Sequence, residues 1–155
     1  MAVKFSASGK VNLDIDTLFS KMTDPRIQEK MAFEFGSLKA ECSASETPDG
    51  KIVVDLFTED PDKKSGGIKK AKLSFSWDRA SKVCNWSRSD LDMGDTVRVE
   101  GVSRLTAAGV GTTSYSDEGE IDIKIPIMGN MIAKKIAEAM ERKFPEKCEF
   151  WSTKA

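Results

Sequence analysis

The chain has 155 residues, 39% of them hydrophobic and 32% charged, which is the length and balance of one globular domain with its own core. With 24 basic and 25 acidic residues the net charge is −1, so nothing electrostatic points to a nucleic-acid partner. No apolar run is long enough to span a membrane, and the N-terminus lacks the apolar stretch of a signal peptide. We therefore expect a single cytoplasmic domain over residues 1–155 without integral membrane contact.

Histidine is absent, which excludes any catalytic triad or metal site that uses imidazole. The cysteines, Cys42, Cys84 and Cys148, are far apart and form no CxxC pair, so each is expected to be a reduced, mostly buried small hydrophobe. We expect no metal and no cofactor. Catalysis would have to use Asp, Glu, Lys or Cys, and the balance favours a non-enzymatic role.

The N-terminal third predicts one strand and two short helices. Residues 3–11 alternate apolar and polar side chains, as a strand does. Apolar side chains then recur at helical spacing, with Asn12 or Asp14 as the N-cap; they are Ile15, Leu18, Phe19 and Met22. The pair Asp24 and Pro25 starts a second helix, whose apolar positions are Ile27, Met31 and Phe35 and which ends at Gly36.

From residue 38 the period changes to two. Alternating segments separated by turn signals occur at 38–44, 51–57, 72–77, 83–89, 97–105 and 112–125. About six consecutive strands with short turns predict an antiparallel meander. The segment 59–72 carries Pro, two glycines and five lysines, which predicts a solvated mobile loop; the alternatives are a flap over a cavity mouth or a weak site for an anionic partner.

The last element is a long helix that begins near Met128. Its apolar positions cover more than about half of the helix circumference; they are Met128, Met131, Ile132, Ile136, Ala139, Met140 and Phe144, with Ala133 and Ala137 beside them. A helix clasped by a curved sheet needs such a wide apolar face. Pro145 should kink or end the helix, and Cys148 and Trp151 continue the apolar face beyond it.

This order of elements resembles the helix-grip fold of the START-related (SRPBCC) superfamily. The C-terminal stretch IDIKIPIMGNMIAKKIAEAM, with its step at Pro126 and Gly129, resembles an uncharacterised, mainly bacterial family of that superfamily. The resemblance implies an α+β fold, in which a curved antiparallel sheet of about seven strands wraps around the C-terminal helix and two short helices follow strand one. It also implies a cavity between sheet and helix for an apolar or amphipathic small molecule.

Candidate ligand-binding residues are the apolar side chains expected on the inner faces. They are Phe75, Trp77, Trp86 and Tyr115 on the strands and Met128, Met131, Ile132 and Met140 on the helix. Arg88 shares the alternation of Trp86 and is a candidate partner for a ligand carboxylate; a solvated strand end is the alternative. For the apolar residues the alternative is plain core packing.

The sequence leaves three functions open. The first is non-catalytic binding of a lipid-like or polycyclic molecule. The second is a cyclase or hydrolase that uses the same cavity. No catalytic residue is predicted for it, because six acidic side chains mostly alternate with apolar neighbours and should face solvent; they are Asp55, Asp90, Glu100, Glu118, Glu120 and Asp122. The third is a protein-interaction domain. The ligand and the oligomeric state are not predicted.

Overall fold

The structure is a computed structural model, and it describes residues 2–155. Within this range the elements are β1 (Val3–Val11), α1 (Ile15–Met22), α2 (Pro25–Glu34), β2 (Lys39–Glu46), β3 (Lys51–Pro61), β4 (Ile68–Asp78), β5 (Val83–Asp90), the short 3₁₀ helix η1 (Gly94–Thr96), β6 (Val97–Ala107), β7 (Thr113–Ile123) and α3 (Gly129–Thr153). This is the predicted order: a strand, two short helices, six strands and a long helix.

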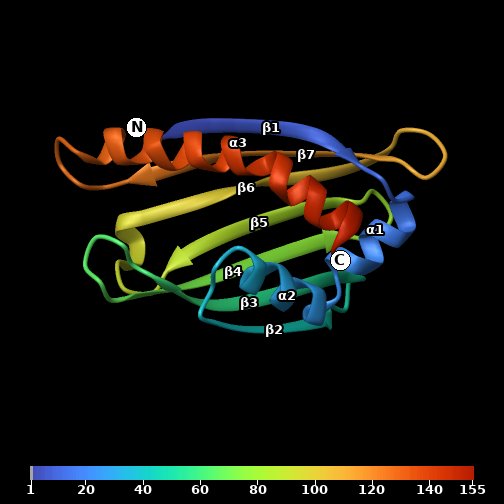
Figure 1. Cartoon of the computed structure of the whole chain (residues 1–155), viewed down its shortest axis with the longest axis horizontal. Coiled ribbons are helices and arrows are strands. Elements are labelled where there is room, and N and C mark those ends of the chain that lie inside the picture. The colour runs from blue at the N-terminus through green and yellow to red at the C-terminus, as the bar shows by residue number, and fades with distance from the viewer. Residues whose placement is uncertain (1) are drawn as a thin grey trace.

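The seven described strands form one antiparallel sheet in the order β1-β7-β6-β5-β4-β3-β2. The strands from β2 to β7 are the predicted meander, and β1 adds to the free edge of β7. The sheet curves, and all three α-helices lie on its concave side (Figure 1). The chain thus has the helix-grip fold, as the sequence indicated.

Helices α1 and α2 begin where side chains were predicted to cap them. The Asp14 carboxylate accepts from the Thr17 backbone N–H at 2.7 Å, and that of Asp24 accepts from Arg26. Pro25 occupies the start of α2. The predicted inner face of α1 is confirmed, because Leu18, Phe19 and Met22 are all buried.

The predicted apolar face of α2 is only partly correct. Ile27 and Met31 are half-buried, but Phe35 is exposed, and the most buried residue of this helix is Gln28. The Gln28 side-chain amide donates to the Met22 carbonyl at 2.8 Å and so ties α2 to the end of α1. Gln28, whose side chain makes this hydrogen bond, therefore occupies the inner position of α2, and the apolar Ile27 and Met31 lie beside it.

Helix α3 continues past Pro145 to Thr153, and the apolar face resumes beyond the proline, since Cys148 and Trp151 are buried. The centre of the buried face differs from the prediction. Small residues, Gly129, Ala133 and Ala137, face the sheet most closely, whereas Ile132 and Ile136 lie on one flank and are half-buried. Small side chains let the helix backbone approach the strands, which hydrophobicity alone does not predict.

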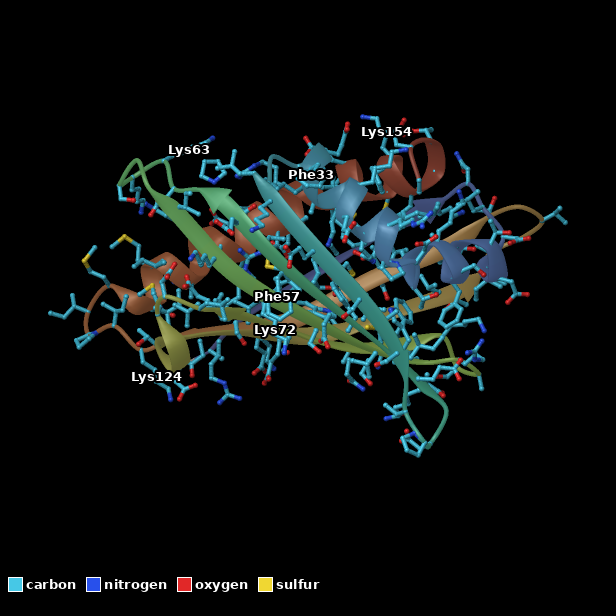
Figure 2. All side chains as sticks on the ribbon, turned by 90° about the horizontal axis from the view of Figure 1, so that it is seen from below. Phe33, Phe57, Lys63, Lys72, Lys124 and Lys154 are labelled. Atoms are coloured by element: carbon cyan, nitrogen blue, oxygen red, sulfur yellow. The ribbon has the colours of Figure 1, made fainter. Side chains whose placement is uncertain are left out.

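The segment 59–72 is mostly a hairpin, which corrects the prediction of a loop. Pairing of β3 with β4 continues to Pro61 and Ile68, so only residues 62–67 form the turn. Lysines spaced along a strand whose outer face meets water are compatible with β-pairing, although their composition suggested disorder. Lys72 lies on that outer face, with its Nζ 5.4 Å from the centroid of the Phe57 ring (Figure 2).

Candidate functional site

Two glycines on neighbouring strands create space for two aromatic rings on the concave face. Gly101 of β6 pairs with Gly119 of β7, Trp86 is the next residue in this row on β5, and Phe5 is the next on β1. A Cβ at Gly101 would lie 2.7 Å from a Trp86 ring carbon, and one at Gly119 would lie 2.9 Å from the Phe5 ring. The two rings therefore cover the glycines, with their centroids 5.9 Å apart.

A polar cluster occupies the neighbouring row of the concave face. Asp117 of β7 pairs with Ser103 of β6, and its Oδ1 accepts from the Ser103 hydroxyl at 3.1 Å and from Trp86 Nε1–H at 2.8 Å. The second oxygen, Oδ2, receives no hydrogen bond from the described residues, and the nearest cation is Lys147 Nζ of α3 at 4.0 Å. Asp117 is only 5% exposed, and this burial raises the pKa of its carboxyl.

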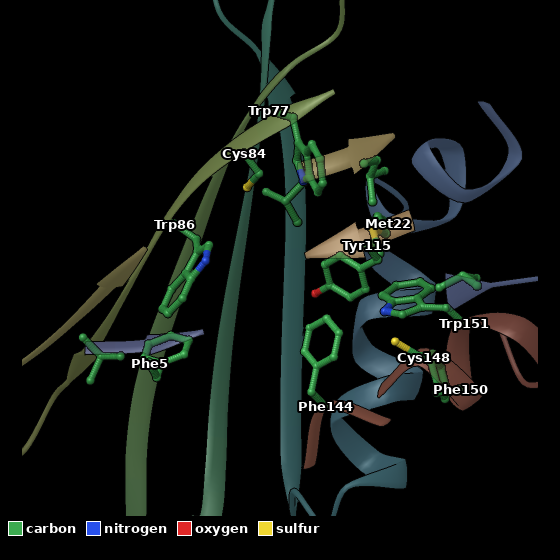
Figure 3. Packing of buried hydrophobic residues seen from close by; sticks show 14 of the residues in the cluster. Phe5, Met22, Trp77, Cys84, Trp86, Tyr115, Phe144, Cys148, Phe150 and Trp151 are labelled. Carbon is green, nitrogen blue, oxygen red and sulfur yellow. The ribbon is translucent and has the colours of Figure 1, made fainter. Parts of the chain in front are cut away.

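Tyr115 lies two residues before Asp117 on the same inner face. Its ring packs against Phe144 of α3 at a centroid distance of 4.7 Å, and Figure 3 shows the two rings next to each other. Burial raises the pKa of the Tyr115 phenol well above its ordinary value, so the group is a neutral hydroxyl throughout the physiological range. Tyr115, Ser103 and Asp117 together supply hydroxyl and carboxylate oxygens within an apolar interior.

The flank of α3 beside this cluster is apolar and incompletely packed. On the other flank, Glu141 accepts from the Ser6 backbone N–H of β1 at 3.2 Å. Because successive helical residues are rotated by about 100°, Ile132 and Ile136 lie on the side away from Glu141. That side faces the middle strands, which lie between α3 and α2 in Figure 1. There Phe75 and Leu73 of β4 are also half-buried.

Arg88 stands where this apolar surface meets solvent. It pairs with Leu73 on β4 and Val99 on β6, and its side chain is 43% exposed. Its guanidinium lies 4.0 Å from a carboxylate oxygen of Asp60, which also accepts from the hydroxyls of Ser37 and Thr58. Since the distance to Asp60 exceeds that of a hydrogen bond, the guanidinium makes no hydrogen bond to a side chain within residues 2–155 and can bind another anion.

The predicted site residues fall into two groups, and two residues that were not predicted form a third. The first group lies on the concave face or the flank beside it: Phe75, Trp77, Trp86, Arg88, Tyr115, Ile132 and Met140. Trp77 is buried against Phe19, with ring centroids 5.5 Å apart, and its Nε1–H has no hydrogen-bond partner among residues 2–155. After Oδ2 of Asp117, this N–H is a second buried polar atom that is able to form a hydrogen bond with a ligand.

Met128 and Met131 form the second group, and each is 52% exposed. Met128 precedes the first turn of α3, and Met131 lies about 160° around the helix from Ala133. Neither reaches the concave face, because the apolar stripe was centred too far toward the large side chains. Asp117 and Ser103 are the third group, which the sequence reasoning missed. The signal was available: Asp117 shares the odd-numbered alternation of Tyr115 and Ile121.

Two surface hollows lie outside this interior. One, of about 480 Å³, lies beside α2 and includes Phe33. The other, of about 730 Å³, lies over Gly101 and Gly119 and is lined mostly by outward-facing residues of the neighbouring strands, together with Phe5, Trp86 and Glu141. Within residues 2–155 no group of Cys, Asp and Glu is arranged to hold a metal ion, and no helix is both long and apolar enough to span a membrane.

Comparison with known proteins agrees with the fold. The model of a family described as "Protein of unknown function (DUF2505)" matches residues 6–153. No curated protein matches the sequence. Among solved structures, TTHA0849 from Thermus thermophilus is 14% identical, with a TM-score of 0.71 over 97% of this chain and 94% of that one.

Of two further structures, one is described by its superfamily and the other by its activity. A START superfamily protein from Mycobacterium smegmatis is 17% identical, with a TM-score of 0.60 over 94% of this chain and 92% of its own. The Zhui aromatase/cyclase from Streptomyces sp. R1128 is 14% identical, with a TM-score of 0.57 over 97% and 88%. At these identities the likeness shows a START-related fold and leaves the activity undetermined.

Proposed function

This chain belongs to the DUF2505 family, and we propose that it binds a small amphipathic molecule between the concave face of the sheet and α3. The fold is one on which proteins with such ligands are built, and START-like and cyclase structures are among its structural neighbours. The ligand would lie along the half-buried flank of α3, with Phe75 opposite. Ile132 and Ile136 already fill part of the space between α3 and the middle strands. This flank of α3 therefore moves aside when the ligand enters.

The observation that carries the proposal is the polar cluster under an apolar helix. A buried carboxylate is costly unless it is hydrogen-bonded, and within the described residues only Oδ1 of Asp117 receives hydrogen bonds. A ligand hydroxyl or amine would donate to Oδ2, and the ligand's apolar body would pack on Trp86 and Phe75. Arg88 at the outer end would hold a ligand carboxylate or sulfonate.

Asp117 also favours a second candidate function, an enzyme of the cyclase or hydrolase kind. Such an enzyme needs an ionisable group inside the ligand site, and burial raises the pKa of the Asp117 carboxyl above its ordinary value, which makes it a better proton acceptor than a solvated carboxylate. The variant Asp117→Asn separates the two functions. It retains a carbonyl oxygen for Trp86 and Ser103 but puts an NH2 donor in place of Oδ2, so a carrier would lose affinity for a ligand that donates there, whereas an enzyme would also lose turnover at saturating substrate.

Binding is tested with 1-anilinonaphthalene-8-sulfonate, which joins an apolar ring system to an anion. We expect its fluorescence to report a dissociation constant that Ile136→Trp weakens at least about tenfold, because the larger ring fills the flank of α3. Met131→Trp is the matched control: it adds the same ring to the same helix at an exposed position, and affinity should stay unchanged. Equal affinity of Ile136→Trp and wild-type protein would show that the site is misplaced.

Native mass spectrometry of protein purified from its own host complements the dye. A co-purifying molecule would supply the ligand's mass, and Ile136→Trp should remove that adduct. Loss of the adduct in both tryptophan variants would indicate binding elsewhere on the helix.

A further inference from the structure

Large apolar side chains are exposed together at one end of the sheet. The connections β3–β4, β5–β6 and β7–α3 all lie at this end, on the left of Figure 1. Backbone hydrogen bonds join them: Leu91 N–H donates to the Lys70 carbonyl, and Lys124 N–H donates to that of Thr96. The apolar residues exposed by 43% or more on these connections and the adjoining element ends are Ile68, Leu91, Met93, Ile127, Met128 and Met131, which we call the apolar end.

Packing of the chain's own core does not explain why an isoleucine stands at position 127. Its side chain is 99% exposed, and its φ of 70° is in the left-handed region, which a β-branched residue rarely adopts. The Met128 N–H donates to the Pro126 carbonyl at 2.8 Å, so Ile127 is the central residue of a tight three-residue turn. Glycine would suit this backbone better. An isoleucine kept here under strain points to a role for the side chain outside the chain's own core.

Lysines stand beside these apolar side chains. The Nζ atoms of Lys63, Lys64 and Lys124 have no ion-pair partner within the described residues, and Figure 2 shows Lys63 and Lys124 on either side of this end. The carboxylates of Asp62, Asp90 and Asp92 accept hydrogen bonds from nearby backbone N–H groups, and that of Asp62 also lies 3.8 Å from Lys69 Nζ. Asp95 and Asp122 also lie here, so the end is not strongly cationic and its apolar side chains supply most of the attraction.

We propose that the apolar end docks on the surface of a lipid bilayer, with Ile127, Met128 and Leu91 inserted between headgroups and the neighbouring lysines at the phosphate level. Apolar side chains on protruding connections, with ammonium groups set beside them, match the layering of acyl chains and phosphates. The proposed ligand site lies near this end, since Arg88 precedes Leu91 by three residues. Docking requires no ligand in that site, so it stands independently of the proposed function.

Flotation with phosphatidylcholine vesicles, with and without added phosphatidylglycerol, tests the proposal. We expect the protein to float with both, and several-fold more tightly with the anionic lipid because of Lys63, Lys64 and Lys124. The double variant Ile127→Gly, Met128→Ser should lower partitioning at least about tenfold, since two apolar side chains leave the bilayer. It should fold normally, because Ile127 packs on nothing and glycine relieves its backbone.

Val110→Ser is the matched control. Val110 is fully exposed on the β6–β7 turn at the opposite end of the sheet, so its loss should leave partitioning unchanged. The proposal is overturned if wild-type protein stays unbound with both vesicles, if the double variant floats as well as wild type, or if Val110→Ser loses as much. Sedimentation showing a wild-type dimer that the double variant dissolves, without vesicle binding, would instead make the apolar end an interface between copies and also overturn it.

Discussion

Gly101→Ala tests whether the glycine pair is the reason why Trp86 and Phe5 lie on the concave face. The added Cβ would lie 2.7 Å and 2.9 Å from two Trp86 ring carbons and 2.3 Å from the Glu118 carbonyl oxygen. None of these atoms is the far end of a flexible side chain. The indole must therefore tilt, and the backbone of β6 must move away from β7.

The magnitude follows from two contributions. Overpacking a well-filled interior costs about 1–3 kcal/mol. Tilting the indole breaks its hydrogen bond to Asp117, and leaving a buried donor and carboxylate imperfectly paired costs about 1–3 kcal/mol more. We expect the free energy of unfolding to fall by about 2–6 kcal/mol, a large part of the total for a domain of this size.

Urea denaturation followed by tryptophan fluorescence measures this loss. Gly67→Ala is the control: its Cβ would lie 3.3 Å from the movable Ser65 hydroxyl, so the effect should stay within about 0.5 kcal/mol. Replacing Trp86 with Leu should reduce the cost of Gly101→Ala, because the ring contacts disappear. A cost below about 1 kcal/mol, or one equal to that of Gly67→Ala, would refute the reasoning.

The remaining predictions concern ionisable groups. Burial raises the pKa of Asp117 in the folded state, so the folded chain holds this proton more tightly than the unfolded chain, and the stability this gives is lost as pH rises through the raised pKa. The stability of Asp117→Asn relative to wild type, from urea midpoints, should therefore increase as pH rises from about 4; a constant difference would contradict the burial of this charge. Burial also raises the pKa of the Cys42 and Cys84 thiols from 9.0 to about 12. At pH 8 a disulfide reagent should label both about a thousandfold more slowly in native protein than in urea, and labelling of either at the unfolded rate would show that it is accessible.

The sequence predicted best what depends on local pattern. The caps at Asp14 and Asp24 follow from side-chain oxygens placed before helices, and the strands follow from alternation. The phase of Trp86 and Arg88 was also correct, because no bulge interrupts β5. Helix α3 was placed correctly along the chain but rotated. The rotation depends on how closely Ala133 approaches β1 and β7, which is a property of the packed tertiary structure.

The candidate site was less predictable, because it depends on which polar residues are buried. Asp117 was not considered for the interior, since a carboxylate on a strand usually faces water; here Trp86 and Ser103 compensate its burial. The prediction of a loop over 59–72 was wrong for the converse reason. Lysines were taken as a sign of disorder, although those of β4 lie on a paired strand. The ligand-binding role of Phe75 and the other lining residues stays a prediction until a ligand is measured.

The pairing of β1 with β7 also constrains how the chain folds during synthesis. Val3 lies opposite Ile121, so the first strand pairs with a segment made 118 residues later. At ordinary elongation rates the first strand waits on the order of ten seconds for its partner. The strands from β2 to β6 pair with near neighbours and are free to form first. A nascent chain stalled before β7 should therefore hold β1 unpaired, where a chaperone or protease reaches it.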